Sequence, residues 1–254
     1  MTSTNYIIQI SDTHLFGDKN SKINGSNSYL NLKNVLNQIK NSLTKPELII
    51  VSGDLSQDCT FESYQNLANL LNHSGVKSLL IPGNHDDTEI INKVFEFNWI
   101  KDNVDYTFSF NNWMLDFIDT TSYPQDSGTL SDIQLLRFEN TLKQNKDKNT
   151  IVFMHHHPIK IDSLLMDSMI LAHNDALKFN NIIKTHPQVK AVLFGHIHQV
   201  FERQINGTFY ASAPSTSFQI LPHCEKFAVD KLTPGYRIIE LKEDKFSSSV
   251  VWVE

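Results

Sequence analysis

The sequence has few cysteines, no long apolar run and no visible secretory signal. Its 254 residues include two cysteines, Cys59 and Cys224, which lie far apart and outside any paired motif. This pattern argues against a disulfide framework or a thiolate metal site, and it is typical of a reducing compartment. No stretch approaches the roughly 18 apolar residues of a membrane span, and the first residues show neither the basic nor the apolar region of a signal peptide. We therefore expect a cytoplasmic protein without a membrane partner.

Basic residues do not exceed acidic ones. Lys and Arg together number 22 and Asp and Glu 28, which gives a net charge of −6 at pH 7. This balance argues against a nucleic acid held by bulk electrostatics. A small phosphate-containing substrate is compatible with it, because bound metal ions can reverse the charge locally. Hydrophobic residues make up 40% and charged residues 20% of the chain, as in ordinary globular proteins.

Strand-like and helix-like segments alternate along the chain. Short apolar runs predict strands at 6–10, 48–51, 76–81, 150–154 and 189–194. Apolar residues at helical spacing predict helices at 29–43, 61–71 and 174–183. Asn111-Asn112 favours a hairpin turn, and Ser131 followed by Gln134 resembles a capping box that opens a helix. With no linker or internal repeat, we expect one α/β domain over residues 1–254, with ligand sites beyond the carboxyl ends of its strands.

Five of the predicted strands end in side chains that can bind a metal ion. They are followed by Asp12 and His14, by Asp54, by Asn84, by the run His155, His156 and His157, and by His196 and His198. Imidazole and carboxylate donors suit divalent ions such as Fe, Mn or Zn, and an aspartate can bridge two ions. Any one of these segments is commonly an ordinary turn. Five of them in succession, each after an apolar strand, predict a centre for two metal ions.

The order of these segments resembles that of the calcineurin-like metallophosphoesterase superfamily. The motifs DTH, GD, GNHD, HHHP and GHIH between Asp12 and His198 carry the resemblance. The tail segments APSTSFQ, PHCEKF and LTPGYRIIEL extend it to the class III cyclic nucleotide phosphodiesterases. The resemblance implies an α/β (α+β) fold, a four-layer αββα sandwich with the metal site at the carboxyl ends of the strands. It also implies hydrolysis of 3′,5′-cyclic AMP to 5′-AMP, and it allows a homodimer.

The resemblance also implies a role for each candidate ligand. It assigns Asp12, His14 and His198 to one ion, Asn84, His156 and His196 to the other, and Asp54 to both. His156 is chosen because the family motif places the ligand two residues before the proline, while His155 and His157 are left to pack or to line the pocket. Fe or Mn are the expected ions, with Zn as an alternative. Ions roughly 3.5–4 Å apart lower the pKa of a bridging water, which then attacks phosphorus as hydroxide.

His85, which follows Asn84, is the candidate general acid and phosphate contact. With Asp54 and Asn84 it forms the expected catalytic group, and Asn84, His85, His14 and His198 are the residues expected around the substrate. Either Asp58 or Asp86 could fix the imidazole of His85, and both could equally be solvated loop acids.

The residues that would recognise a base are less defined. Phe16, Phe218 and His223 are candidates, and Ser215, Thr216 and Ser217 could lie near the metal ions. A phosphodiesterase of broader specificity, acting on 2′,3′-cyclic nucleotides or glycerophosphodiesters, is the alternative within the family. A metal-binding scaffold without activity should lack a ligand or His85, and all of them are present.

Overall fold

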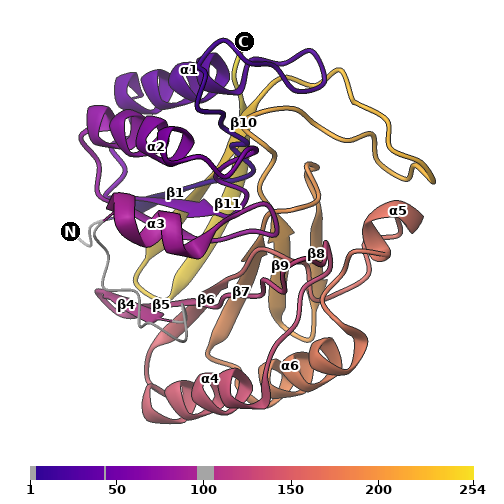
Figure 1. Cartoon of the computed structure of the whole chain (residues 1–254). Coiled ribbons are helices and arrows are strands. Elements are labelled where there is room, and N and C mark those ends of the chain that lie inside the picture. The colour runs from indigo at the N-terminus through magenta and orange to yellow at the C-terminus, as the bar shows by residue number, and fades with distance from the viewer. Residues whose placement is uncertain (1–3, 43, 96–105) are drawn as a thin grey trace.

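Two mixed β-sheets face each other in the computed structural model, which describes residues 4–42, 44–95 and 106–254 (Figure 1). The first sheet has the order β11-β10-β1-β2-β3, with β1 (Asn5–Ile10), β2 (Leu48–Ser52), β3 (Ser78–Ile81), β10 (Gly235–Lys242) and β11 (Lys245–Trp252). The second has the order β4-β5-β6-β7-β9-β8, with β4 (Tyr106–Phe110), β5 (Trp113–Phe117), β6 (Asn149–Phe153), β7 (Val189–Phe194), β8 (Glu202–Ile205) and β9 (Thr208–Ser212). Strands β1 to β3 run parallel, as do β5, β6, β7 and β9. The carboxyl ends of each parallel set therefore meet at one edge of its sheet.

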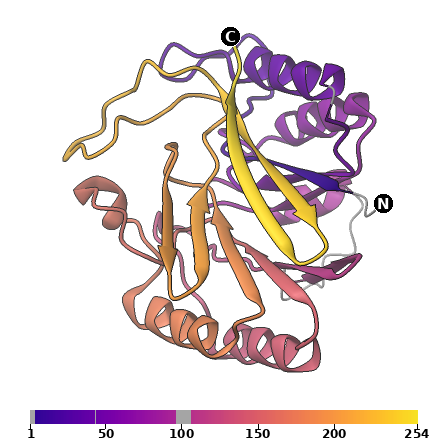
Figure 2. The same ribbon diagram turned by 180° about the vertical axis from the view of Figure 1, so that it is seen from behind.

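Helices cover the outer face of each sheet, as the two opposite views show (Figures 1 and 2). The first sheet carries α1 (Ser28–Asn41), α2 (Phe61–Ser74) and α3 (Thr88–Phe95), and the second carries α4 (Asp132–Gln144) and α6 (His173–Thr185). The short helix α5 (Leu164–Asp167) lies in the connection between β6 and α6. The expected four-layer αββα arrangement is therefore confirmed.

Successive side chains of each parallel strand point alternately to the two faces of its sheet. Ile8 and Ile10 of β1 pack with Leu32 and Val35 of α1, whereas Ile7, on the opposite face of the strand, packs in the cluster shared by both sheets. Parallel strands that are covered on both faces by other layers are expected to carry apolar side chains on both faces. This double burial fixes the strands and so fixes the loops that follow them.

Local sequence signals predicted several elements correctly. The capping box of Ser131 and Gln134 opens α4, and Phe110 pairs with Trp113 across the predicted hairpin turn. The helix expected at 29–43 ends at Asn41, and residue 43 lies outside the described residues. Helix α3 was not anticipated, and the single-domain organisation stays a prediction. In the described ranges, no helix is long and apolar enough to cross a membrane.

Candidate metal centre

The loops that follow β1, β2, β6 and β7 are tied to one another by short hydrogen bonds. The backbone N–H of Asp12 donates to the carbonyl of Gly53 at 3.0 Å, and that of His14 donates to the carbonyl of Asp54 at 2.9 Å. Between β7 and β1, the N–H of His196 donates to the Asp12 carboxylate at 3.0 Å. The segments that the sequence predicts to act together are therefore joined in one place, although their strands belong to two sheets.

Several of the candidate ligands have a left-handed backbone. The φ angles of Asp12, His14, Asp54, His196 and His198 lie between 43° and 69°. Non-glycine residues adopt this region uncommonly and at a cost, and such residues cluster at functional sites. The sharp turns aim these side chains back across the ends of the strands, where they meet.

One buried cluster contains Asp12, His14, Asp54 and His198. One ligand atom of each lies within 4.8 Å of the others. The Nε2 atoms of His14 and His198 are 3.0 Å apart, and His14 Nε2 is 3.6 Å from Asp54 Oδ2. His198 Nε2 is 3.5 Å from Asp12 Oδ1. Two imidazoles and two carboxylates thus converge as a metal ion requires.

A second buried cluster contains His155, His156 and His196, again with ligand atoms within 4.8 Å of one another. His155 Nε2 lies 3.1 Å from Asn84 Oδ1 and 3.3 Å from Asp54 Oδ1. The two oxygens of Asp54 therefore face different clusters, Oδ2 towards His14 and Oδ1 towards His155. This placement suits a carboxylate shared by two ions.

The three consecutive histidines have different surroundings. His155 is not among the ligands expected from the sequence, yet the structure brings this ring, rather than that of His156, against Asn84 and Asp54. His156 Nδ1 is 2.7 Å from Thr120 Oγ1, and its Nε2 is buried without a hydrogen-bond partner among the described residues. His157 points to Asp167 at 3.7 Å. His156 stays a predicted ligand, and His155 must be added as a candidate.

Hydrogen bonds to the histidine rings fix which nitrogen faces the centre. His155 Nδ1 lies 2.8 Å from the carbonyl of Ser52, and His198 Nδ1 lies 2.8 Å from the carbonyl of Phe218. A carbonyl only accepts, so Nδ1 carries the hydrogen of the neutral ring, and Nε2 is the nitrogen left to bind a metal ion. Gln57 Oε1 likewise accepts a hydrogen bond from His14 Nδ1 at 2.8 Å. Gln57 could not be predicted from the sequence, because no local pattern links it to a histidine 43 positions away.

The donor set fits divalent cations. The Nε2 atoms of His156 and His196 are buried without a hydrogen-bond partner among the described residues, and such an atom costs roughly 1–3 kcal/mol when nothing binds it. Burial lowers the pKa of His14 to about 3, despite the opposing charge of Asp54, so the ring is neutral, the form that binds a metal. Burial also raises the pKa of Asp12, against the opposing charge of His198. Cations would compensate these buried groups.

His85 lies beside the first cluster. Its backbone N–H donates to Asp54 Oδ1 at 3.0 Å, and its ring meets the His14 ring edge-on at 5.1 Å between centroids. The structure brings it, with Asn84, to the expected place. Both residues are half-buried, so a substrate can reach them.

Neither proposed carboxylate partner of His85 contacts its imidazole in the hydrogen bonds and ion pairs of the described residues. Asp86 accepts from the backbone N–H groups of Leu55 and Gly83 and from the hydroxyl of Tyr64. Asp58 accepts from Gly17 N–H and from the N–H and hydroxyl of Thr60. Both acids hold loop backbone in place, but Asp58 is exposed, as expected of a solvated loop acid, whereas Asp86 is half-buried.

The candidate base contacts are only partly brought together. Phe218 lies next to the first cluster, with its ring centroid 4.6 Å from that of His198. Ser215 donates from Oγ to the carbonyl of Asp12 at 2.8 Å, and Thr216 N–H donates to the carbonyl of Ser11. Ser215, Thr216 and Ser217 are buried and thus support the ligand loop from behind. His223 is exposed and bonds to the carbonyl of Asp162.

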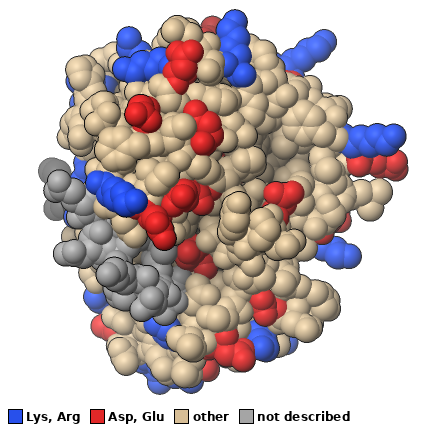
Figure 3. Space-filling model, in the orientation of Figure 1, with Lys and Arg blue, Asp and Glu red and all other residues tan. Residues whose placement is uncertain are grey.

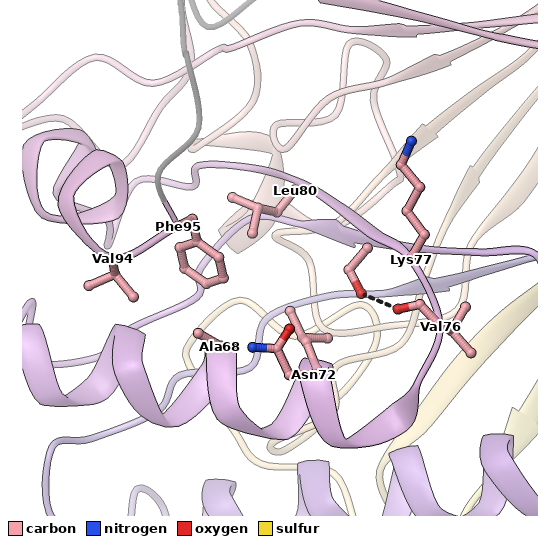
Figure 4. A pocket seen from close by; sticks show the side chains of 9 residues that line it. Ala68, Asn72, Val76, Lys77, Leu80, Val94 and Phe95 are labelled. Atoms are coloured by element: carbon pink, nitrogen blue, oxygen red, sulfur yellow. Dashed lines mark hydrogen bonds between the residues drawn. The ribbon is translucent and has the colours of Figure 1, made fainter.

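The charge distribution on one face and a separate pocket give no reason to place the functional site elsewhere. On the face in Figure 3, the described residues include acidic side chains spread over it and no continuous band of basic ones. A pocket of about 310 Å³ lies between α2, α3 and β3 (Figure 4). Apolar side chains such as Ala68, Leu80 and Val94 line it together with the polar Asn72 and the charged Lys77. Among the described residues, its lining contains no side chain that commonly binds a metal ion.

Comparison with known proteins agrees with the geometry. The sequence matches the family described as calcineurin-like phosphoesterase over residues 6–200. It is 31% identical over 238 residues to the 3′,5′-cyclic adenosine monophosphate phosphodiesterase CpdA of Escherichia coli K12, covering 94% of this chain and 86% of that protein. A 3′,5′-cyclic-nucleotide phosphodiesterase of Nostoc sp. is also 31% identical over 238 residues, covering 94% and 88%. A dimetal phosphatase from Danio rerio has the same fold, with a TM-score of 0.69, 14% identity and coverage of 98% and 99%.

Proposed function

Because this chain belongs to the calcineurin-like phosphoesterase family, we propose that it hydrolyses 3′,5′-cyclic AMP to 5′-AMP. Family membership and the two buried clusters identify it as a metal-dependent phosphoesterase. The relatives in Escherichia coli and Nostoc, both phosphodiesterases for cyclic nucleotides, support the choice of substrate. The observation that carries the proposal is the position of Asp54, whose two oxygens face the two clusters separately.

Two divalent ions complete the proposed site. Asp12, His14 and His198 would hold one, Asn84, His196 and His155 or His156 would hold the other, and Asp54 would bind both. Nitrogen and oxygen donors favour Fe or Mn, with Zn as the alternative. When bound, such ions supply Lewis-acid charge at the phosphate and lower the pKa of a water molecule that serves as the nucleophile.

The residues of the chain would orient the phosphate and move the proton. Asn84 and His85 follow β3 directly, and the bond from His85 N–H to Asp54 fixes the loop that carries the imidazole. After this water has lost a proton to solvent, its oxygen would bond to phosphorus as the bond from phosphorus to the 3′-oxygen breaks. His85 gives a proton to this 3′-oxygen, which is a poor leaving group as an alkoxide. His14 and His198 border the same space and limit how the phosphate can lie.

A broader phosphodiesterase is the alternative, since the same residues would act on 2′,3′-cyclic nucleotides or glycerophosphodiesters. A non-catalytic scaffold is less well supported, because every candidate ligand and His85 are present. The proposal places the enzyme in the cytoplasm, in keeping with its two unpaired cysteines.

Initial rates on 3′,5′-cyclic AMP, cyclic GMP, 2′,3′-cyclic AMP and a glycerophosphodiester test the proposal, with metal content measured on the same samples. Cyclic AMP should give the highest kcat/KM, and it would be rejected as the substrate if it were the poorest of the four. His85→Ala should keep its metal and lose about 10²–10⁴-fold in rate. Asn84→Ala should lose metal. His73→Ala, at an exposed position, is the matched control and should change neither quantity.

A further inference from the structure

A series of aromatic contacts leads outward from the metal centre. The ring of Phe218 lies 4.6 Å from that of His198 and 5.9 Å from that of His14. Phe227 meets Phe218 edge-on, with centroids 6.2 Å apart and planes at 73°. Phe227 thus stands two ring contacts away from a proposed metal ligand.

Phe218 and Phe227 are held by the loop between β9 and β10, the yellow-orange segment that projects at the upper right of Figure 1. Its two limbs run antiparallel, since Ile220 bridges Val229 and Leu221 N–H donates to the carbonyl of Ala228 at 2.8 Å. The loop is anchored at the centre, because the carbonyl of Phe218 accepts from His198 Nδ1. Phe227 therefore has a defined place relative to the ligands.

The exposure of the two rings differs sharply. Phe218 is 8% exposed and belongs to the core, whereas Phe227 is 51% exposed. Leaving a large apolar side chain in water forgoes the free energy of its burial, so a half-exposed ring beside a reactive centre is available for a ligand. Phe227 also ends the tail segment PHCEKF, to which the proposed chemistry gives no role.

We propose that Phe227 is a specificity-determining residue that stacks against the planar base of the substrate while the phosphate lies at the metal centre. In a nucleotide, the sugar separates the base from the phosphate, just as Phe218 separates Phe227 from His198. The proposal rests on the phosphodiesterase function and deepens it, because it identifies the substrate class as phosphodiesters that carry an aromatic ring system. Aromatic stacking tolerates different bases, since every base has a π-face.

Substitution of Phe227 tests this role in the metal-loaded enzyme. Phe227→Ala should raise KM for cyclic AMP about 10- to 100-fold, the usual effect of losing one base stack, with little change in kcat. Its rate on glycerophosphoethanolamine, which has no ring, should stay at the wild-type value. Phe227→Tyr should restore KM. Val229→Ala removes another exposed apolar side chain of the same loop and serves as the control.

A binding measurement gives a second readout. Phe227→Trp should lose fluorescence on addition of 5′-AMP, whereas ribose 5-phosphate should leave it unchanged. An unchanged KM for cyclic AMP in Phe227→Ala, or an equal loss on glycerophosphoethanolamine, would overturn the stacking role. Failure of the proposed function would look different, because the wild-type enzyme itself would then fail to prefer cyclic AMP. Comparison of aromatic with ring-free phosphodiesters would still test Phe227 in that case.

Discussion

Replacing Gly83 by alanine should disturb the candidate metal centre, because the structure leaves no room for an added methyl group at this position. Gly83 lies directly behind the shared carboxylate, on the loop after β3. An added β-carbon would lie 2.2 Å from Asp54 Oδ1, 2.3 Å from the backbone nitrogen of Asp54 and 2.8 Å from His155 Cε1. These are backbone and ligand atoms, so no flexible side-chain end can move aside.

The size of the effect follows from these distances. Ordinary non-bonded contacts between heavy atoms are about 3.5–4 Å, so the loop or Asp54 must move by about 1 Å. Overpacking of this kind costs about 1–3 kcal/mol, and each kcal/mol lowers the Tm of a chain of this size by roughly 2–4 °C. Metal-ligand distances tolerate about 0.2 Å, and a 1 Å misplacement in an active site costs about 10²-fold in rate. Gly83→Ala should therefore lose both metal and activity.

Metal content after dialysis, thermal denaturation and the rate on cyclic AMP measure these three effects. The control is Gly207→Asn, in a turn where φ is +87° and nothing lies within 4 Å of an added β-carbon. Asparagine tolerates this backbone conformation, so the control should keep metal and rate. A Gly83→Ala protein with two ions, wild-type Tm and wild-type rate would show that the centre is not packed this tightly, and would refute the reasoning.

Three further predictions concern the support of the site and of the fold. Gln57→Leu removes the acceptor of His14 Nδ1 and should weaken metal binding about 10- to 100-fold in chelator competition; equal affinity would contradict it. Burial lowers the pKa of His155, but Asp54 outweighs it and raises the pKa to about 9. Metal must displace that proton, so affinity should rise with pH up to about 9, with proton release seen by calorimetry in two buffers. In metal-free protein, protonation of His155 should stabilise the folded state fully below pH 6.5, and this stabilisation should be lost as pH rises through about 9. A metal affinity and a free energy of unfolding that do not change with pH would contradict this prediction. Arg237→Met removes the hydrogen bonds from the buried Arg237 of the first sheet to the carbonyl of Ser212 and to Glu202 of the second sheet and should lower the free energy of unfolding by about 1–3 kcal/mol in urea without changing metal content.

Local signals in the sequence determined much of this protein. Strands β1, β2, β3, β6 and β7 were predicted because apolar runs mark strands buried on both faces, and the capping box at Ser131 was predicted because its partners lie three residues apart. The order of the ligand segments after those strands predicted the candidate centre from Asp12 to His198. Each of these signals depends on neighbours along the chain, which sequence analysis can see.

The tertiary structure decided how residues from different strands meet. Because side chains alternate along a strand, the sequence predicts that His155 and His156 point opposite ways. Only the packing of one sheet on the other brings His155 against Asn84 and Asp54. The roles of Asp86, which holds backbone N–H groups, and of Gln57, which orients His14, depend on contacts between distant segments. A ligand list can thus be predicted from strand ends, whereas the partner of each ligand atom is fixed by sheet register and packing, which have no local signature.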